Sequence, residues 1–344
     1  MNEWFVDQAR IEAVERFGYS LPEATFLCLA ALHGGYFVRR QFNSFIQRKR
    51  GWRAANLIDK LIRNGHAKAV VHARNRAVYH ISAKPFYAAL GEQDNRNRRD
   101  RQPFTIKNKL MALDYVLSHP GQRYLATERE KCAYFTTHVG ISSERLPVRS
   151  YESADRRTST LRYFVDKFPI HVSAPLDGAT PVVSLCFVDE GLTTLSRLET
   201  HVMQYSGLLL SLPSVRFVYI ADSDRLFRPA EQVFRRVLAR FGMPEPDSSA
   251  VHDARLREHF RDRDLFERRQ TSGFNKERLD QLRQDLQTFA GEPYQSLYHR
   301  WKQDRDVCGA AGPSPGMCPT DPAFDTHLLP HDYDLFGTIL ERAS

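Results

Sequence analysis

The chain has 344 residues, of which 42% are apolar and 26% charged, and its formal net charge at pH 7 is +8. This is the composition of an ordinary soluble protein, and the chain is long enough to bury a sizeable core and to form two domains. No run approaches the roughly 20 apolar residues of a membrane span, and the N-terminus lacks the basic start and apolar middle of a signal peptide. We therefore expect a cytoplasmic protein with no membrane partner.

The first predicted helix covers residues 21–32, because Pro22 lies early in its first turn, apolar residues recur at helical spacing and Gly34 ends it. A second helix is predicted at residues 39–47. A third is predicted at residues 51–64, where an apolar stripe occupies one face and basic or amide side chains occupy the other.

This part of the chain is strongly basic. Residues 36–84 carry twelve Lys and Arg residues against a single acid, Asp59, so they are more positive than the whole chain. A concentrated positive field is what a polyanionic partner requires, and double-stranded DNA is the first such partner to consider.

Two β-rich runs follow the third helix, at residues 67–71 and 77–81, and Asn75 suits the tip of the hairpin between them. Three helices and a two-stranded wing predict a winged helix-turn-helix, whose third helix reads bases in the major groove. The residues expected to contact DNA are Arg39, Arg40, Arg48, Lys49, Arg50, Arg53, Asn56, Lys60, Arg63, Arg74 and Arg76. The alternatives are a winged helix used only for protein contacts and a basic solvated surface.

A second domain is predicted after residues 92–103, which are polar throughout and read as a linker. A helix at residues 105–118 either leads into this domain or serves as a dimer helix. Two continuous apolar runs joined by a helix form a βαβ unit, which predicts parallel strands. The elements expected there are strands at 181–188 and 215–221, a helix at 195–212, antiparallel strands at 163–166 and 170–172, and a helix at 230–241.

The predicted fold class is thus α+β or α/β, in four segments. These are a winged helix-turn-helix DNA-binding domain at 1–91, the polar linker at 92–103, an α/β domain with a mostly parallel central sheet at 104–245, and a charged helical tail with a Gly/Pro-rich loop at 246–344. The apolar stripe of residues 251–290 needs a partner, either the α/β domain or another subunit. A homodimer would suit a DNA reader, because two half-sites increase affinity and site length together.

Residues 187–191 (Phe-Val-Asp-Glu-Gly), a following helix with Tyr205, and the apolar strand at 216–220 resemble the replication-relaxation family of plasmid and integrative-element proteins. The resemblance covers residues 20–240. It implies a DNA-binding protein of a mobile element whose second domain is a nuclease-type fold that has often lost its active site. It also implies a DNA-binding role for the helix with Arg53 and Asn56.

The resemblance raises the question of a metal-dependent nuclease, for which Asp189 and Glu190 are the candidate metal ligands. Such nucleases place a Lys two residues after the second acid, but positions 191 and 192 are Gly and Leu. Asp166 and Lys167 lie upstream, but the Asp-x-Glu-x-Lys order of such nucleases is absent. We therefore expect no catalytic residues, no bound metal and a protein that is not an enzyme.

Other constellations are weaker. Cys308, Cys318, His327 and His331 form a conceivable zinc set, but the two cysteines are ten residues apart and lack the spacing of a zinc ribbon. No Gly-rich phosphate-binding loop is present, so no cofactor is expected. The expected function is sequence-specific binding of double-stranded DNA as a dimeric transcriptional regulator or maintenance factor of a mobile element, with an unidentified small-molecule or protein effector. A nuclease and a non-enzymatic interaction scaffold are the alternatives.

Overall fold

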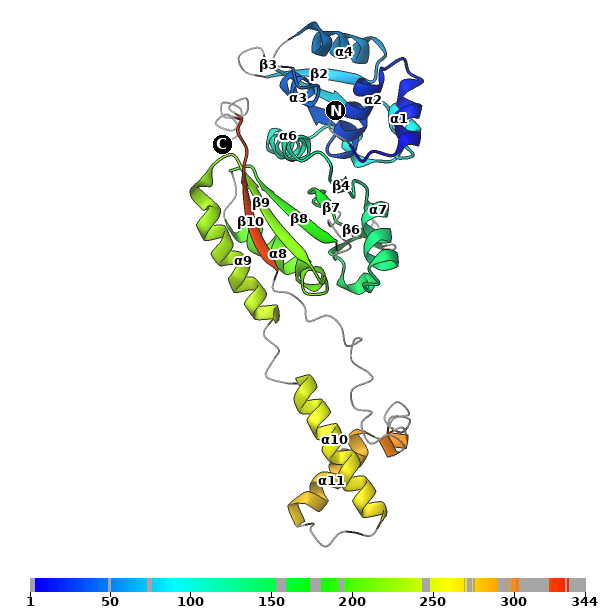
Figure 1. Cartoon of the computed structure of the whole chain (residues 1–344), viewed down its shortest axis with the longest axis vertical. Helices are drawn as coiled ribbons and strands as arrows, with labels where there is room; N and C mark the ends of the chain where they lie inside the picture. The colour runs from blue at the N-terminus through cyan, green and yellow to red at the C-terminus, as the bar shows by residue number, and fades with distance from the viewer. Residues whose placement is uncertain are drawn as a thin grey trace. The chain divides into compact units, whose positions relative to one another are not determined.

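The computed structural model describes residues 4–48, 51–72, 76–152, 159–173, 181–191, 195–242, 248–268, 276–289 and 322–331, together with residues 270, 274, 295, 298, 299, 301, 302 and 333. It is a mixed α and β structure with several sheets (Figure 1). The chain divides into two compact units, which we call unit 1 (residues 1–239 and 319–344) and unit 2 (residues 240–318). None of the described helices combines the length and the apolar character needed to cross a bilayer.

Unit 1 begins with a helical layer and a small antiparallel sheet of strand order β1-β3-β2. Its elements are α1 (Gln8–Glu15), α2 (Leu21–Leu32), β1 (Tyr36–Phe37), α3 (Arg39–Phe45), α4 (Trp52–Arg63), β2 (Ala67–His72) and β3 (Arg76–Ile81). At the start of α2 the Glu23 carboxylate accepts a hydrogen bond from the Ser20 N–H at 2.9 Å, which satisfies one of the free donors of a helix N-terminus. The Phe26 ring of α2 lies against Phe37 and Phe42, so β1 and α3 pack on α2.

The segment that follows, with α5 (Lys84–Ala89) and the short 3-10 helix η2 (Arg96–Arg98), is packed against these helices. The Asn97 side chain is 1% exposed and donates to the main-chain oxygens of Ala31 at 2.9 Å and Leu32 at 3.1 Å. Gly35 has φ +80°, and a Cβ at this position would lie only 2.7 Å from the main-chain oxygen of Asn97. Within the predicted linker at 92–103, Asn97 is therefore buried and not solvated, because its side chain satisfies main-chain oxygens of α2.

Helix α6 (Pro103–Ser118) is the central element of unit 1. Leu113 packs in the core of the N-terminal helices, whereas Leu110 and Tyr115 belong to the core of the large sheet. The Gln41 amide of α3 also donates to the main-chain oxygen of Leu110 at 2.9 Å. The predicted helix is confirmed, and residues 109–116 of it are buried within unit 1.

The large sheet has the strand order β10-β9-β8-β7-β4 (Figure 1). Its strands are β4 (Arg123–Tyr124), β7 (Ile170–Ser173), β8 (Val182–Asp189), β9 (Val215–Ala221) and β10 (Ala323–Leu328). Strands β8, β9 and β10 are parallel, and β7 and β4 are antiparallel to their neighbours. Helix α8 (Leu195–Leu209) connects β8 to β9, so the predicted βαβ unit is confirmed. The strand β10 was not predicted, and the C-terminal tail is therefore not entirely helical.

The two faces of this sheet are covered by different helices. On one face Phe217 of β9 contacts His201 of α8 and Phe234 of α9 (Phe227–Gly242). On the other face His171 of β7 contacts Tyr115 of α6. Because side chains alternate along a strand, both faces of the central strands are buried, which explains why β8 and β9 read as continuous apolar runs.

The remaining described elements of unit 1 flank the sheet. They are α7 (Glu128–Ala133), the π-helical turn η3 (Tyr134–His138), the 3-10 turns η4 (Ser143–Arg145) and η6 (Asp224–Leu226), and the hairpin of β5 (Val148–Glu152) and β6 (Ser159–Tyr163). The hairpin is a separate two-stranded antiparallel sheet. The strand expected at 163–166 therefore ends at Tyr163 and does not join the large sheet.

Unit 2 contains α10 (Ser248–Glu267) and α11 (Lys276–Thr288). Its core consists of Leu256, Phe260, Phe289, Tyr298 and Trp301. The apolar stripe of residues 251–290 is thus partly buried within unit 2. The boundaries of the two units also differ from the predicted division, because residues 92–103 and the strand β10 both belong to unit 1.

Candidate functional site

Helix α4 has one buried and one exposed face, as its sequence pattern indicates. Ala54, Leu57, Ile58 and Leu61 are buried, while Arg53, Asn56 and Arg63 are exposed on the opposite side. Within the described part of the chain these three side chains make no hydrogen bond or ion pair with the protein. Their donors and acceptors are therefore free for an external partner.

Trp52 was not among the predicted site residues. It is the first residue of α4 and is 68% exposed. Exposure of a ring this large is unusual, since burial of an apolar side chain stabilises the fold. The sequence does hold a signal for it, because Trp52 falls outside the apolar stripe of the helix.

Three of the predicted DNA contacts are engaged within the protein. Arg40 forms a two-pronged ion pair with Asp114 of α6, at 2.6 and 2.7 Å. Lys60 pairs with Glu23 at 2.7 Å, and Arg39 donates to the main-chain oxygen of Gly51 at 3.0 Å. Arg40 and Lys60 hold helices together, so we leave both out of the proposed interface.

The other predicted contacts are placed as follows. Arg48 is exposed after α3. Lys49, Arg50 and Arg74 lie outside the described residues, as does the side chain of Arg76, whose backbone lies in β3. The structure therefore brings together Arg53, Asn56 and Arg63, and the contribution of the wing stays a prediction.

The strand-end acids are both buried and hydrogen-bonded. Asp189 is 5% exposed and accepts from the Tyr219 hydroxyl and from the Gly191 N–H. Glu190 is 1% exposed, pairs with Arg197 and accepts from the Asn108 amide. Both carboxylates thus stabilise the end of β8 and its contacts with α6, α8 and β9.

A small cavity of ≈ 90 Å³ is lined by Glu190, and by Arg197, Asp166, Lys109 and Lys167, among others. Burial alone would raise the pKa of Asp166, but the hydrogen bond and charge of His201, at 3.2 Å, hold that pKa at about 2. Tyr205, which is part of the family resemblance, donates to the same carboxylate at 2.9 Å. Asp166 is thus an ionised carboxylate occupied by protein donors.

The conceivable zinc set is not assembled by the described residues. Cys308 and Cys318 lie outside them, and His327 of β10 packs edge-on against the ring of Tyr115. Across the described ranges, no three His, Cys, Asp or Glu residues are grouped so that they could hold a metal ion.

Compared with protein-family models, with curated proteins and with solved structures, the chain shows no match.

Proposed function

We propose that this chain is a sequence-specific double-stranded DNA-binding protein in which α4 enters the major groove. The element order α2, β1, α3, α4, β2, β3 and the sheet order β1-β3-β2 are those expected of a winged helix-turn-helix. The observation that carries the proposal is the exposed face of α4, where Arg53, Asn56 and Arg63 have no partner among the described residues. Arg and Asn are the side chains that bind guanine and adenine in a bidentate manner.

The biological role that we propose is regulation or maintenance of a mobile element. A dimer would provide two half-sites, as sequence-specific readers of this kind commonly do. An interaction scaffold would instead show no salt-sensitive affinity for DNA. The first experiment is a selection of preferred sites from random duplex DNA with the full chain.

Replacing Arg53 or Asn56 by Ala is expected to weaken binding to the selected site by about 1–3 kcal/mol, because each loses a bidentate base contact. The preference at one base pair should relax in each variant, as measured by fluorescence anisotropy on a set of single-base variants of the site. Arg283→Ala is the matched control, because the Arg283 side chain is 77% exposed and lies in unit 2. A uniform loss on all sequences would instead assign the two residues to phosphate contacts.

A metal-dependent nuclease is the second candidate, since the small cavity gathers Asp166, Glu190 and Lys167. We propose that the chain does not cleave DNA, because no Lys occupies position 191 or 192 and the acids already bind protein donors. Supercoiled plasmid is expected to stay intact with magnesium or manganese, as followed on agarose gels. Metal-dependent nicking that disappears in Asp189→Asn or Glu190→Gln, with folding and DNA binding retained, would establish the nuclease instead.

A further inference from the structure

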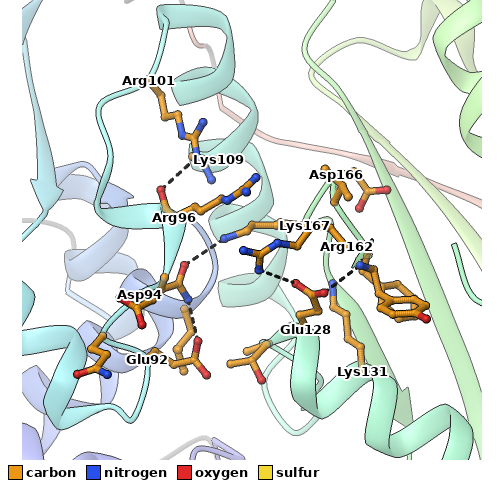
Figure 2. A pocket seen from close by; sticks show the side chains of 18 of the residues that line it. Glu92, Asp94, Arg96, Arg101, Lys109, Glu128, Lys131, Arg162, Asp166 and Lys167 are labelled. Atoms are coloured by element: carbon orange, nitrogen blue, oxygen red, sulfur yellow. Dashed lines mark hydrogen bonds and ion pairs between the residues drawn. The ribbon is translucent and has the colours of Figure 1, made fainter. Parts of the chain in front are cut away.

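Unit 1 contains a second, larger cavity of ≈ 570 Å³, which the proposed DNA interface does not use. Its walls come from the segment before η2, the start of α6, helix α7, the ends of β5 and β6, and the turn that follows β6 (Figure 2). The cations that line it are Arg96, Arg101, Lys109, Lys131, Arg162 and Lys167, and the acids are Glu92, Asp94, Glu128 and Asp166. Basic side chains thus outnumber acidic ones in a concave site.

Two of these four acids have other partners in the protein. Asp166 binds His201 and Tyr205. Glu128 accepts from the Tyr163 N–H at 2.9 Å, with Arg162 3.8 Å from its other oxygen. These two carboxylates therefore already have protein partners and form no ion pair with Lys109 or Lys167 among the described residues.

Two lysines share one neutral acceptor, and Lys167 also donates to Oδ1 of Asn95 at 3.0 Å. The Nζ atoms of Lys109 and Lys167 lie 3.3 and 3.2 Å from the same oxygen, Oδ1 of Asn97. In the described part of the chain neither ammonium group has a carboxylate within ion-pairing distance, although Lys109 is only 9% exposed. Lys167 also has a left-handed backbone, with φ 58°, which is uncommon outside glycine. In addition, the buried Nε of Arg101 has no hydrogen-bond partner within the described residues.

The electrostatic cost of this arrangement appears in the pKa values. Burial, together with the charges of Lys167 and Arg101, lowers the pKa of Lys109 to about 7. Burial and the charges of Arg101 and Lys131 likewise lower the pKa of Lys167 to about 8. Buried charges of one sign are retained in proteins where something compensates them.

We propose that this cavity binds a small phosphate-bearing molecule, whose phosphate oxygens accept hydrogen bonds from Lys109, Lys167 and Arg101. A phosphate brings about two negative charges and several acceptors, which matches converging ammonium and guanidinium donors. The volume falls within the range of about 300–1,000 Å³ typical of small-molecule sites, and the rings of Tyr151 and Tyr163 line the same space. The site is independent of the α4 face.

The test is binding of inorganic pyrophosphate to the full chain, measured by calorimetry at constant ionic strength. We expect saturable binding by the native protein, and at least a tenfold loss of affinity in Lys109→Met and in Lys167→Met. Met retains the length of the aliphatic stem without the buried charge, so folding should survive. The control is Lys84→Met, which removes an exposed lysine and should bind as the native protein does. Equal affinity in all variants, or no binding by the native protein, would overturn the proposal.

A second arm separates a small ligand from a nucleic-acid backbone. A duplex carrying the selected site should not compete with pyrophosphate, and Lys109→Met should retain its DNA affinity. Competition by DNA or by a single-stranded oligonucleotide that depends on Lys109 would assign these cations to nucleic acid and overturn the small-ligand assignment. Failure of Arg53→Ala to affect DNA binding would leave the cavity result unchanged.

A third arm uses pH. The groups facing the two lysines are Arg101, Arg96, Lys131, Glu92 and Asp166, and the pKa values of Lys109 and Lys167 are lowered to about 7 and about 8. Sulfate, which keeps its charge over this range, should bind about tenfold or more weakly at pH 9 than at pH 6.5, because both ammonium groups lose protons in this window. A flat profile would exclude Lys109 and Lys167 as the anion ligands.

Discussion

Replacing Asn97 by Ala should lower the free energy of unfolding of unit 1 by about 3–5 kcal/mol, since each buried polar group left without a partner costs about 1–3 kcal/mol. The Asn97 amide serves two main-chain oxygens, those of Ala31 and Leu32. The side-chain oxygen of Asn97 accepts hydrogen bonds from Lys109 and Lys167. The substitution removes all four hydrogen bonds at a position that is 1% exposed.

Urea unfolding followed by the fluorescence of Trp4 measures this loss. Trp4 packs against Phe45 in unit 1, so replacing Trp52 and Trp301 by Phe in the reference protein leaves one reporter. Asn64→Ala is the matched control: Asn64 is exposed, and its amide donates to the main-chain oxygen of Phe17 over a long distance of 3.4 Å. The control should change stability by about 0.5 kcal/mol or less. A similar small change for Asn97→Ala would mean that the segment around η2 does not anchor unit 1.

The elements that the sequence predicts well are those with a strong periodic signal. The stripe of Ala54, Leu57 and Leu61 defines α4 because apolar side chains recur once per helical turn. The continuous apolar runs of β8 and β9, with a helix between them, predict parallel pairing, and the register Val183 to Val215 confirms it. In these segments local pattern and tertiary contacts agree.

The strand β10 shows what local pattern does not reveal. Four of its six residues are exposed and two are half-buried, and it pairs with β9 across about a hundred intervening residues, as in the register Ala323 to Arg216. The pairing depends on an edge that β9 offers, and that edge exists only once the sheet has formed. A short strand of mixed polarity carries no periodic signal of its own.

The basic residues show a related limit. Composition identified a positive stretch, but it did not distinguish Arg53, which is exposed, from Arg40, which pairs with Asp114 seventy-four positions away. In the same way, the polar composition of residues 92–103 predicts a solvated linker unless the buried carbonyl partners of Asn97 are known. The cationic cavity was missed for this reason, because its residues come together only in the folded unit.

Replacing Asp114 by Ala should lower the free energy of unfolding of unit 1 by about 3–5 kcal/mol, the usual effect of removing one partner of a buried ion pair. The Asp114 side chain is 6% exposed and binds both Arg40 and the hydroxyl of Tyr333. Without it the Arg40 guanidinium stays in a partly buried position with no countercharge, and Tyr333, 3% exposed, loses its acceptor.

The control for Asp114 is Asp325→Ala, because Asp325 also pairs with an arginine, Arg216, at 3.0 Å, but with both side chains about half exposed. An exposed pair contributes about 1 kcal/mol or less, so the two substitutions should separate clearly in urea unfolding.

A further variant, Arg40→Leu, tests whether Arg40 contacts DNA. If Arg40 holds α3 to α6, then Arg40→Leu in the native background should lower stability and leave the salt dependence of DNA affinity unchanged, whereas a phosphate contact would lower the slope of log affinity against log salt by about one. Such a change in slope without a loss of stability would return Arg40 to the DNA interface and contradict its assignment as a structural residue.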